Sequence, residues 1–382
     1  MRDDLPFVLM RGGTSKGIFL RAEDVPADRA QLTKLLLDLF GSPDRRQIDG
    51  LGGADKLTSK AAIVGKPVRE GTDVTYLFGQ VGTVRAEVDY KLNCGNLTAA
   101  VGVYAIQEGL VAPVEGTTVV RVHSVNTDSV IRVEVPVQGG KPVWKGDFAI
   151  GGVPGTGAAI SLDFSQAAGA ITGKLLPTGN AVDILDVPGV GAVEMSIVDG
   201  PNLAVYVQPE VLRMAGIESP DEIDADEDLK RRMDAIRKAV AYRCGLREYW
   251  DARQAPSTPM LIVTSPPADY RTCTQGDLVE ANGIDLVVRQ FASGSASKTL
   301  AGTLTATTGM ACRVPGTLPH RLLTATRGAA ARPLAFGHPS GVIYVEAEVD
   351  SATGGAPVVR RMAVQRTARR LAEGRAFLKD AF

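Results

Sequence analysis

Several features that mark other protein classes are scarce in this sequence of 382 residues. Its four cysteines, at positions 94, 244, 273 and 312, have no CxxC spacing, which excludes a disulfide framework and a zinc knuckle and indicates a reducing compartment. No apolar run approaches the roughly 20 residues that span a bilayer, and the N-terminus lacks the apolar region of a signal peptide. We therefore expect a cytoplasmic protein with no metal centre and no membrane partner.

An excess of charge of one sign is also lacking, since 42 basic residues balance 43 acidic ones. No basic cluster is interleaved with aromatic residues, which argues against nucleic acid as a partner and favours a small molecule. Aromatic residues make up only 5% of the chain, whereas glycine (42) and proline (22) are abundant and short Val/Ile-rich runs recur between turn signals. This composition is typical of a sheet-rich protein.

The stretch 93–106 (NCGNLTAAVGVYAI) places a thiol at the start of a predicted helix. Asn93 can cap this helix, and the residues that follow are apolar on nearly every side, which is typical of a helix surrounded by protein. The first amide groups of a helix stabilise thiolates and bind anions. Cys94 is therefore either a reactive sulfur beside an anion site or a buried space-filling residue, and this stretch alone favours neither.

A second copy of this pattern shifts the balance towards function. Ala301 aligns with Cys94, and the segments 94–103 and 301–310 share five identical pairs: Gly95/Gly302, Leu97/Leu304, Thr98/Thr305, Ala99/Ala306 and Gly102/Gly309. The repeat and the chain length predict two homologous domains, 1–184 and 185–382, with the C-terminal tail free to pack on the first. The thiol is present in the first copy only, so chemistry between the halves is asymmetric.

Two further segments of the first half carry polar groups beside glycine. Arg11, Thr14 and Ser15 lie in a glycine-rich turn between two predicted strands, and the GxxxxGK[ST] order of a phosphate loop is absent. This turn is either an ordinary hairpin turn or a carboxylate clamp built on the Arg11 guanidinium. Lys60 begins an apolar strand after the loop 47–55. Most such lysines are solvated, but a partly desolvated lysine is suited to proton transfer.

The second half offers a corresponding set of polar residues. Ser297, Lys298 and Thr299 supply hydroxyls and a cation at the start of the second central helix, and His338 lies in a turn where a histidine is more often structural than catalytic. A charged periodic pattern over 221–245 predicts one long surface helix. In the first half, 28–40 predicts a helix that ends at Gly41-Ser42-Pro43.

Six motifs, in their order along nearly the whole chain, resemble the PrpF family: MRGGTSKG (10–17), LTSK (57–60), NCGN (93–96), LPTGN (176–180), HPSG (338–341) and RTAR (366–369). That family is similar in fold to diaminopimelate epimerase and proline racemase. The resemblance implies an α+β fold of two similar domains, each a mostly antiparallel barrel-like sheet around a central helix, with the active site between them. It also implies a cofactor-free isomerase that moves a double bond in a small unsaturated di- or tricarboxylate, as aconitate, methylaconitate, methylitaconate and oxalomesaconate isomerases do.

The resemblance assigns the family's catalytic lysine and cysteine to Lys60 and Cys94. In a 1,3-shift one group can remove a proton from one carbon and return it to another on the same face, so Lys60 alone suffices as acid and base. The carbanion is delocalised into a carboxylate, and its charge needs donors placed in advance. The expected substrate-binding residues are Arg11, Thr14, Ser15, Gly95, Asn96, Ser297, Lys298, Thr299 and His338.

One departure from the family concerns Ser297-Lys298, because similar isomerases carry a histidine just before the second central helix; substrate choice depends on this position. Two other functions stay open. A racemase or epimerase would use the same fold, but it needs a base on each face of the substrate, and Ala301 counts against it. A non-enzymatic accessory or metabolite-binding protein is the second alternative. A homodimer is left open as well.

Overall fold

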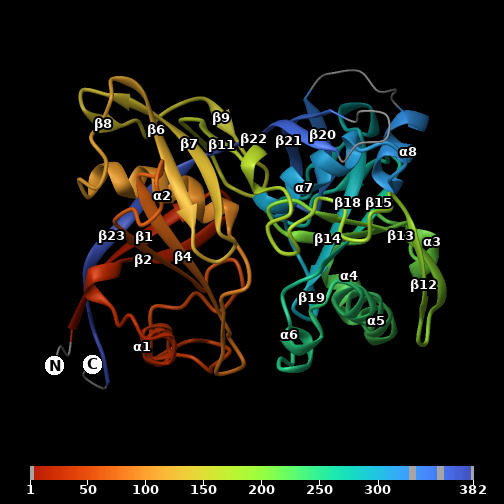
Figure 1. Ribbon diagram of the computed structural model, residues 1–382, viewed down its shortest axis with the longest axis horizontal. Coiled ribbons are helices and arrows are strands. Elements are labelled where there is room, and N and C mark those ends of the chain that lie inside the picture. The colour runs from red at the N-terminus through yellow and green to blue at the C-terminus, as the bar shows by residue number, and fades with distance from the viewer. Residues whose placement is uncertain (1–3, 327–332, 351–356, 380–382) are drawn as a thin grey trace. The chain divides into compact units, whose positions relative to one another are not determined.

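The computed structural model describes residues 4–326, 333–350 and 357–379 and divides the chain into two compact units (Figure 1). The first unit takes the residues up to 149, 153–162 and those from 365 on, and the second takes 150–152 and 163–364. This division falls earlier than the expected boundary at 184. The reason is that the loop before β12 is bound to Asp199 of the second unit, whose carboxylate accepts the backbone N–H groups of Ile171 and Thr172.

Within its described residues, the first unit contains two α-helices, one short 3-10 helix (Ala22–Asp24) and most of the N-terminal strands. Its α-helices are α1 (Arg29–Phe40) and α2 (Gly95–Gln107). Its strands are β1 (Asp4–Gly12), β2 (Ser15–Arg21), β3 (Lys60–Gly65), β4 (Val74–Val81), β5 (Val88–Asp89), β6 (Gly116–Ser124), β7 (Ser129–Gln138), β8 (Lys141–Pro142), β9 (Phe148–Ala149), β10 (Thr156–Gly157), β11 (Ile160–Asp163, which ends in the second unit) and β23 (Ala368–Phe377).

The main sheet of this unit runs in the order β23–β1–β2–β3–β4–β6–β7–β8. The pairs β2–β3 and β4–β6 are parallel and the other pairs are antiparallel. The last strand of the chain, β23, therefore pairs with the first, β1. A mostly antiparallel sheet was predicted and is confirmed.

Two helices cover the two faces of this sheet. Ala61 and Ile63 of β3 pack with the buried leucines of α1, which begins at the Asp28 cap and ends at Gly41 as predicted. Side chains alternate along a strand, so Lys60 points to the opposite face. On that face α2 contacts β1 to β4, β6 to β8 and β23, and all of its residues from Gly95 to Ile106 are buried (Figure 1). The predicted helix surrounded by protein is confirmed.

The second unit contains the remaining elements. Its helices are α3 (Pro209–Leu212), α4 (Pro220–Ala225), α5 (Glu227–Arg243), α6 (Arg247–Asp251), α7 (Gly302–Arg313) and α8 (Leu318–Thr326). Its strands are β12 (Asp183–Val187), β13 (Gly191–Asp199), β14 (Leu203–Val207), β15 (Met260–Ser265), β16 (Tyr270–Arg271), β17 (Leu278–Val279), β18 (Leu286–Ala292), β19 (Ser295–Ala296), β20 (Leu334–His338), β21 (Gly341–Asp350) and β22 (Val358–Arg366, which ends in the first unit).

The strand pairing of the second unit repeats that of the first. Its pairs β13–β14, β14–β15, β15–β18, β18–β20 and β20–β21 are antiparallel, parallel, antiparallel, parallel and antiparallel in turn. The pairs from β1–β2 to β6–β7 follow the same alternation, and α7 lies between β18 and β20 in the chain as α2 lies between β4 and β6. The helix pattern read from the sequence therefore marks a structural repeat. By this match β3, which Lys60 begins, corresponds to β15, which Met260 begins.

The long helix predicted over 221–245 is wrong in one respect, because the structure has two helices there. Asp226 adopts an extended conformation (φ −91°, ψ 95°) after α4, and its carboxylate accepts the Leu229 N–H at 2.9 Å to cap α5. A cap of this kind competes with helix continuation. Among the described residues, every helix is too short or too polar to cross a membrane.

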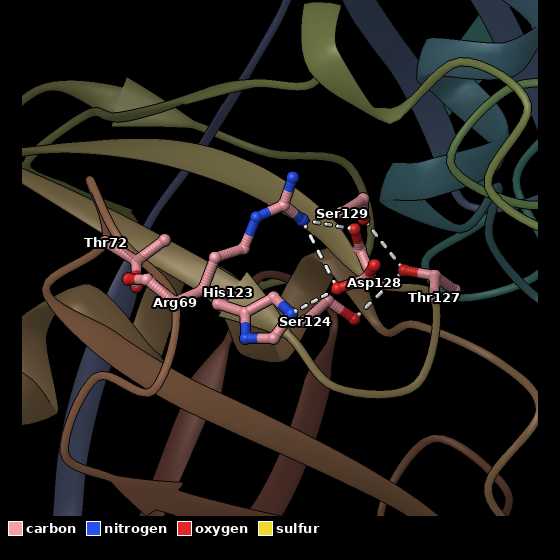
Figure 2. A network of polar contacts seen from close by, with 7 residues as sticks. All are labelled: Arg69, Thr72, His123, Ser124, Thr127, Asp128 and Ser129. Atoms are coloured by element: carbon pink, nitrogen blue, oxygen red, sulfur yellow. Dashed lines mark hydrogen bonds and ion pairs between the residues drawn. The ribbon is translucent and has the colours of Figure 1, made fainter.

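A polar network around Asp128 holds the turn between β6 and β7 (Figure 2). Asp128 has a left-handed backbone (φ 48°), its carboxylate lies 2.7 Å from His123 Nε2, and Arg69 donates to its carbonyl oxygen at 2.7 Å. The hydrogen bond from His123 holds the pKa of the Asp128 carboxyl below its usual value. The ionised carboxylate is therefore the form that fits this turn.

We expect the two aligned glycines of the central helices, Gly102 and Gly309, to differ in how well they tolerate replacement by alanine. A Cβ at Gly102 would lie 2.6 Å from Val133 Cγ1, and a valine in a strand has few rotamers with which to yield. At Gly309 the nearest atom, Val345 Cγ1, would be 3.1 Å away. We expect Gly102→Ala to lower the free energy of unfolding by about 1–3 kcal/mol. Gly309→Ala should cost less, because its Cβ makes a milder clash, while either substitution regains up to about 1 kcal/mol by replacing a helical glycine.

Chemical unfolding followed by fluorescence measures both variants, since Trp144 lies in the first unit and Trp250 in the second. Replacing one tryptophan by phenylalanine isolates the other as the probe. An effect of Gly309→Ala as large as that of Gly102→Ala would contradict the packing described for α2 and β7.

The Asp128 network predicts a pH dependence of stability. A carboxyl whose pKa is lowered by folding stabilises the protein above its unfolded value of 3.8, and this contribution is lost as the pH falls through the folded pKa. Asp128→Asn should therefore flatten the decline in unfolding midpoint between about pH 5 and pH 3. The effect is expected to stay below about 1 kcal/mol, because the carboxylate is exposed. Urea unfolding at several pH values tests it, and parallel pH profiles of the two proteins would refute it.

Candidate active site

Lys60 is the first residue of β3 and is held in place from both neighbouring strands. It pairs with Gly17 of β2 and with Gln80 of β4, and the Gln80 amide donates to the carbonyl oxygens of Lys56 and Ser59 just before it. Its Nζ lies 5.2 Å from the centre of the Phe78 ring, and the residue is only 8% exposed. The amine is thus largely removed from water, as the proton-transfer hypothesis requires.

Cys94 lies at the start of α2 and faces Lys60 directly. Its Sγ is 3.5 Å from Lys60 Nζ, and the residue is buried. The prediction that Asn93 caps α2 is wrong: Cys94 itself occupies the cap position in an extended conformation (φ −111°, ψ 93°), without a side-chain cap hydrogen bond. The structure therefore places the thiol, the amine and the first amide groups of α2 together.

The glycine-rich turn meets the same helix end. The Asn96 side-chain amide donates to Thr14 Oγ1 at 2.9 Å and to Ser15 Oγ at 3.4 Å. The turn needs glycine at Gly13, which has a φ of +50° and whose Cβ would lie 2.3 Å from Asn96 Oδ1. Thr14, Ser15, Gly95 and Asn96, all predicted to bind substrate, are therefore neighbours in one corner of the first unit.

The Arg11 guanidinium has a structural task in this corner. Its Nη1 donates to the carbonyl oxygens of Gly13 at 2.9 Å and Thr367 at 3.0 Å, and the Gly13 N–H donates to the same Thr367 oxygen. Burial, and then the nearby charge of Arg369, lowers the pKa of Arg11. Arg11 thus ties the turn to the C-terminal strands, and its role as a carboxylate clamp stays a prediction.

Arg366 and Tyr76 are two site residues that were not among the predicted ones. Arg366 donates from Nε to Asn96 Oδ1 at 2.9 Å, and burial lowers its pKa to about 9, an effect that Cys94 partly offsets. Burial raises the pKa of the Tyr76 hydroxyl well above its usual value, and Cys94 raises it further. Both side chains are therefore buried within electrostatic range of the thiol.

A weak sequence signal was available for both residues. Tyr76 shares its strand face with Phe78 and Gln80, because side chains on one face recur every second residue. Arg366 opens the RTAR motif at the end of β22, next to buried apolar positions. The motif served only to recognise the family, and no local pattern indicates that this arginine reaches Asn96.

In the second unit the predicted residues form a cluster of their own. Ser340 Oγ donates to the Lys298 carbonyl oxygen at 2.6 Å, and the Ser340 N–H donates to His338 Nδ1 at 3.2 Å. Ser297 and Thr299 are buried, while the Lys298 side chain is exposed. The structure thus brings His338 to the segment that precedes α7, and Ala301 occupies the cap position there.

Comparison of the sequence with known protein families and proteins identifies its relatives. A model of the PrpF protein family matches residues 3–379. The chain belongs to the PrpF family. It is 43% identical over 379 residues to 3-methylitaconate isomerase of Eubacterium barkeri, an alignment that covers 99% of this chain and 98% of the relative. The family indicated by the six motifs is therefore confirmed.

Solved structures place this PrpF chain in a known fold. It is similar to the crystal structure of methylitaconate-delta-isomerase, with a TM-score of 0.79 and 42% identity, covering 99% of this chain and 97% of the other. A hydroxyproline epimerase from Agrobacterium vitis, with trans-4-hydroxy-L-proline bound, matches with a TM-score of 0.54 at 9% identity, covering 99% and 94%. The second likeness concerns the fold alone and confirms the predicted racemase-like, diaminopimelate epimerase-like α+β class.

The contacts of Arg11 predict a loss of stability when its side chain is removed. Arg11→Ala deletes two charge-assisted hydrogen bonds to backbone carbonyls and should lower the free energy of unfolding of the first unit by about 1.5–3 kcal/mol. Denaturant unfolding followed through Trp144 measures this change. Unchanged unfolding together with weakened carboxylate binding would contradict the structural role and favour the clamp.

Proposed function

We propose that this protein is a cofactor-independent allylic (delta) isomerase. It shifts a C=C double bond by 1,3-proton transfer in an unsaturated di- or tricarboxylate such as aconitate, methylaconitate or oxalomesaconate. The protein acts in the cytoplasm on this small molecule rather than on nucleic acid. Whether the protein forms a homodimer is left open, and its molar mass in solution, measured by light scattering, would answer this.

One observation carries the proposal: Lys60 Nζ lies 3.5 Å from Cys94 Sγ, with both residues buried at the N-terminus of α2. An amine and a thiol in contact supply two groups that can exchange protons with a carbon acid. The relatives support the reaction type, since a protein 43% identical over 379 residues is named 3-methylitaconate isomerase.

The reaction follows from this placement. The neutral amine of Lys60 removes a proton from the saturated carbon beside the double bond, and the electron pair spreads over the allylic system and its carboxylate. The resulting ammonium returns the proton to the other end of the allylic system on the same face, which moves the double bond. No electrons are gained or lost, so no redox partner is needed. Cys94 is a secondary group that either holds or delivers a proton opposite Lys60 or only shapes the pocket.

Donors at the start of α2 stabilise the intermediate. The first N–H groups of a helix have no intrahelical acceptor, so those of Gly95 and Asn96 are available for negative charge. Asn96 is held against Thr14 and Ser15, which keeps this end of the helix in position. Donors that are already oriented stabilise developing charge without reorganisation. In the second unit, Ser297, Lys298, Thr299 and His338 stay predicted substrate-binding residues.

A racemase or epimerase is the less favoured alternative. Such an enzyme needs an acid or base on both faces of one carbon, and its second group would come from the other half of the chain. The positions that match Lys60 and Cys94 in the second unit hold Met260 and Ala301, neither of which can transfer a proton. The one-sided placement of these groups suits a same-face 1,3-shift.

The proposal predicts the order of two variants. Lys60→Met should lower the isomerisation rate by roughly 10²–10⁴-fold with the fold retained, as removal of a general acid/base does. Cys94→Ser should slow the reaction less. Proton NMR in deuterium oxide with a panel of unsaturated di- and tricarboxylates measures both rates and the position of deuterium.

Three results would decide against parts of this assignment. Near-normal turnover by Lys60→Met would remove Lys60 from the mechanism. A larger loss in Cys94→Ser than in Lys60→Met would make the thiol the principal base. A wild-type protein that exchanges no proton in any member of the panel would favour the accessory or metabolite-binding alternative.

A further inference from the structure

Three arginines are the largest fully buried side chains of the described residues: Arg237, Arg289 and Arg366. In two of them every guanidinium nitrogen has an acceptor. Arg289 donates from Nε, Nη1 and Nη2 to the carbonyl oxygens of Glu218, Val288 and Ile217 at 2.6, 3.0 and 2.8 Å. Arg237 bonds in the same way to two carbonyl oxygens and to the Asp234 carboxylate. These two arginines are structural.

Arg366 differs from the other two. Its Nε donates to Asn96 Oδ1 at 2.9 Å and its Nη1 to the Gln365 carbonyl oxygen at 2.7 Å, but its buried Nη2 has no hydrogen-bond partner within the described part of the chain. None of the ion pairs formed by the described residues joins Arg366 to a carboxylate. A buried charge without a counter-ion is costly unless a partner arrives. The lowered pKa of Arg366 reflects the same cost.

The surroundings indicate what that partner is. Arg366 bonds to the second residue of α2, beside the first amide groups of that helix, and lies within electrostatic range of Cys94. Gly13 packs closely against the same side chain, since a Cβ on it would lie 3.0 Å from Arg366 Cδ. The helix amide groups and the guanidinium donate hydrogen bonds, and the guanidinium carries a positive charge. The missing partner is therefore an acceptor with negative charge.

We propose that Arg366 binds a carboxylate of the ligand through Nη2 at the N-terminus of α2. The inference rests on the proposed function, because it takes the ligand to be the polycarboxylate that reacts at Lys60. Arg366 is in this view a substrate-binding residue. The Asn96 contact fixes the guanidinium so that Nη2 is presented to one carboxylate oxygen.

Binding of a saturated analogue tests the proposal without chemistry. Tricarballylate has three carboxylates and no double bond to move, so calorimetry on the whole protein measures affinity alone. Arg366→Gln should weaken its binding by about tenfold to hundredfold, the usual effect of losing one charge-assisted hydrogen bond. Arg366→Lys should bind more tightly than Arg366→Gln, since it keeps the charge. The matched control is Arg289→Lys, which disturbs an equally buried arginine and should leave the affinity within about twofold while lowering the thermal midpoint.

A second variant keeps the test valid if Arg366→Gln does not fold. Asn96→Asp puts a carboxylate 2.9 Å from Arg366 Nε and so supplies the counter-ion from within the protein. It should bind tricarballylate at least about tenfold more weakly than wild type. Wild-type affinity in Arg366→Gln or in Asn96→Asp would overturn the proposal. So would equal losses in Arg366→Gln and Arg289→Lys, or a wild-type protein that does not bind tricarballylate.

Kinetics separate this inference from the proposed function. With an isomerised substrate, Arg366→Gln should raise KM by the same factor while kcat changes less, because binding is lost rather than the proton-transfer group. A wild-type enzyme that isomerises its substrate, with an unchanged KM in Arg366→Gln, would sink the Arg366 assignment alone. Arg366-dependent binding of tricarballylate by a protein that isomerises nothing would sink the proposed reaction alone.

Discussion

The burial of α2 inside the first sheet is the constraint on which the rest of this structure depends. The residues of this helix from Gly95 to Ile106 are all buried, and its N-terminal amide groups lie where β3 begins. The sheet therefore positions Lys60 at the N-terminus of α2, where the helix has N–H donors without an intrahelical acceptor and a positive electrostatic potential. The Gly102 contact with β7 sets how closely helix and sheet approach.

Local sequence patterns predicted the parts of the site that local chemistry determines. Cys94 at a helix start, Lys60 at a strand start and the glycine-rich turn all follow from short-range signals, and the structure contains each of them. The contact between Lys60 and Cys94 depends on strand pairing, so the sequence predicted it only through the resemblance to a family. Arg366 reaches Asn96 across 270 positions of the chain, and no periodicity reports such a contact.

The wrong predictions have physical causes of the same kind. Asp226 interrupts a helical pattern because its side chain bonds to the backbone, a competition that periodicity cannot reveal. Asn93 has the chemistry of a cap, but the backbone turns one residue later, at Cys94. The repeat located both central helices correctly, yet it gave no information on where the loop before β12 is bound. The two copies share their strand pairing, but Met260 and Ala301 occupy the positions at which the first copy has a lysine and a cysteine.

The pairing of β1 with β23 has a consequence for the synthesis of this protein. While the chain is still emerging from the ribosome, β1 can pair only with β2, and the far side of β1 stays an open edge until residues 368–377 have been translated. The second unit is complete before that moment, so the half that is made first finishes folding last. Arg366 arrives in the same final segment. A nascent chain therefore carries Lys60 and Cys94 long before it acquires the guanidinium that bonds to Asn96.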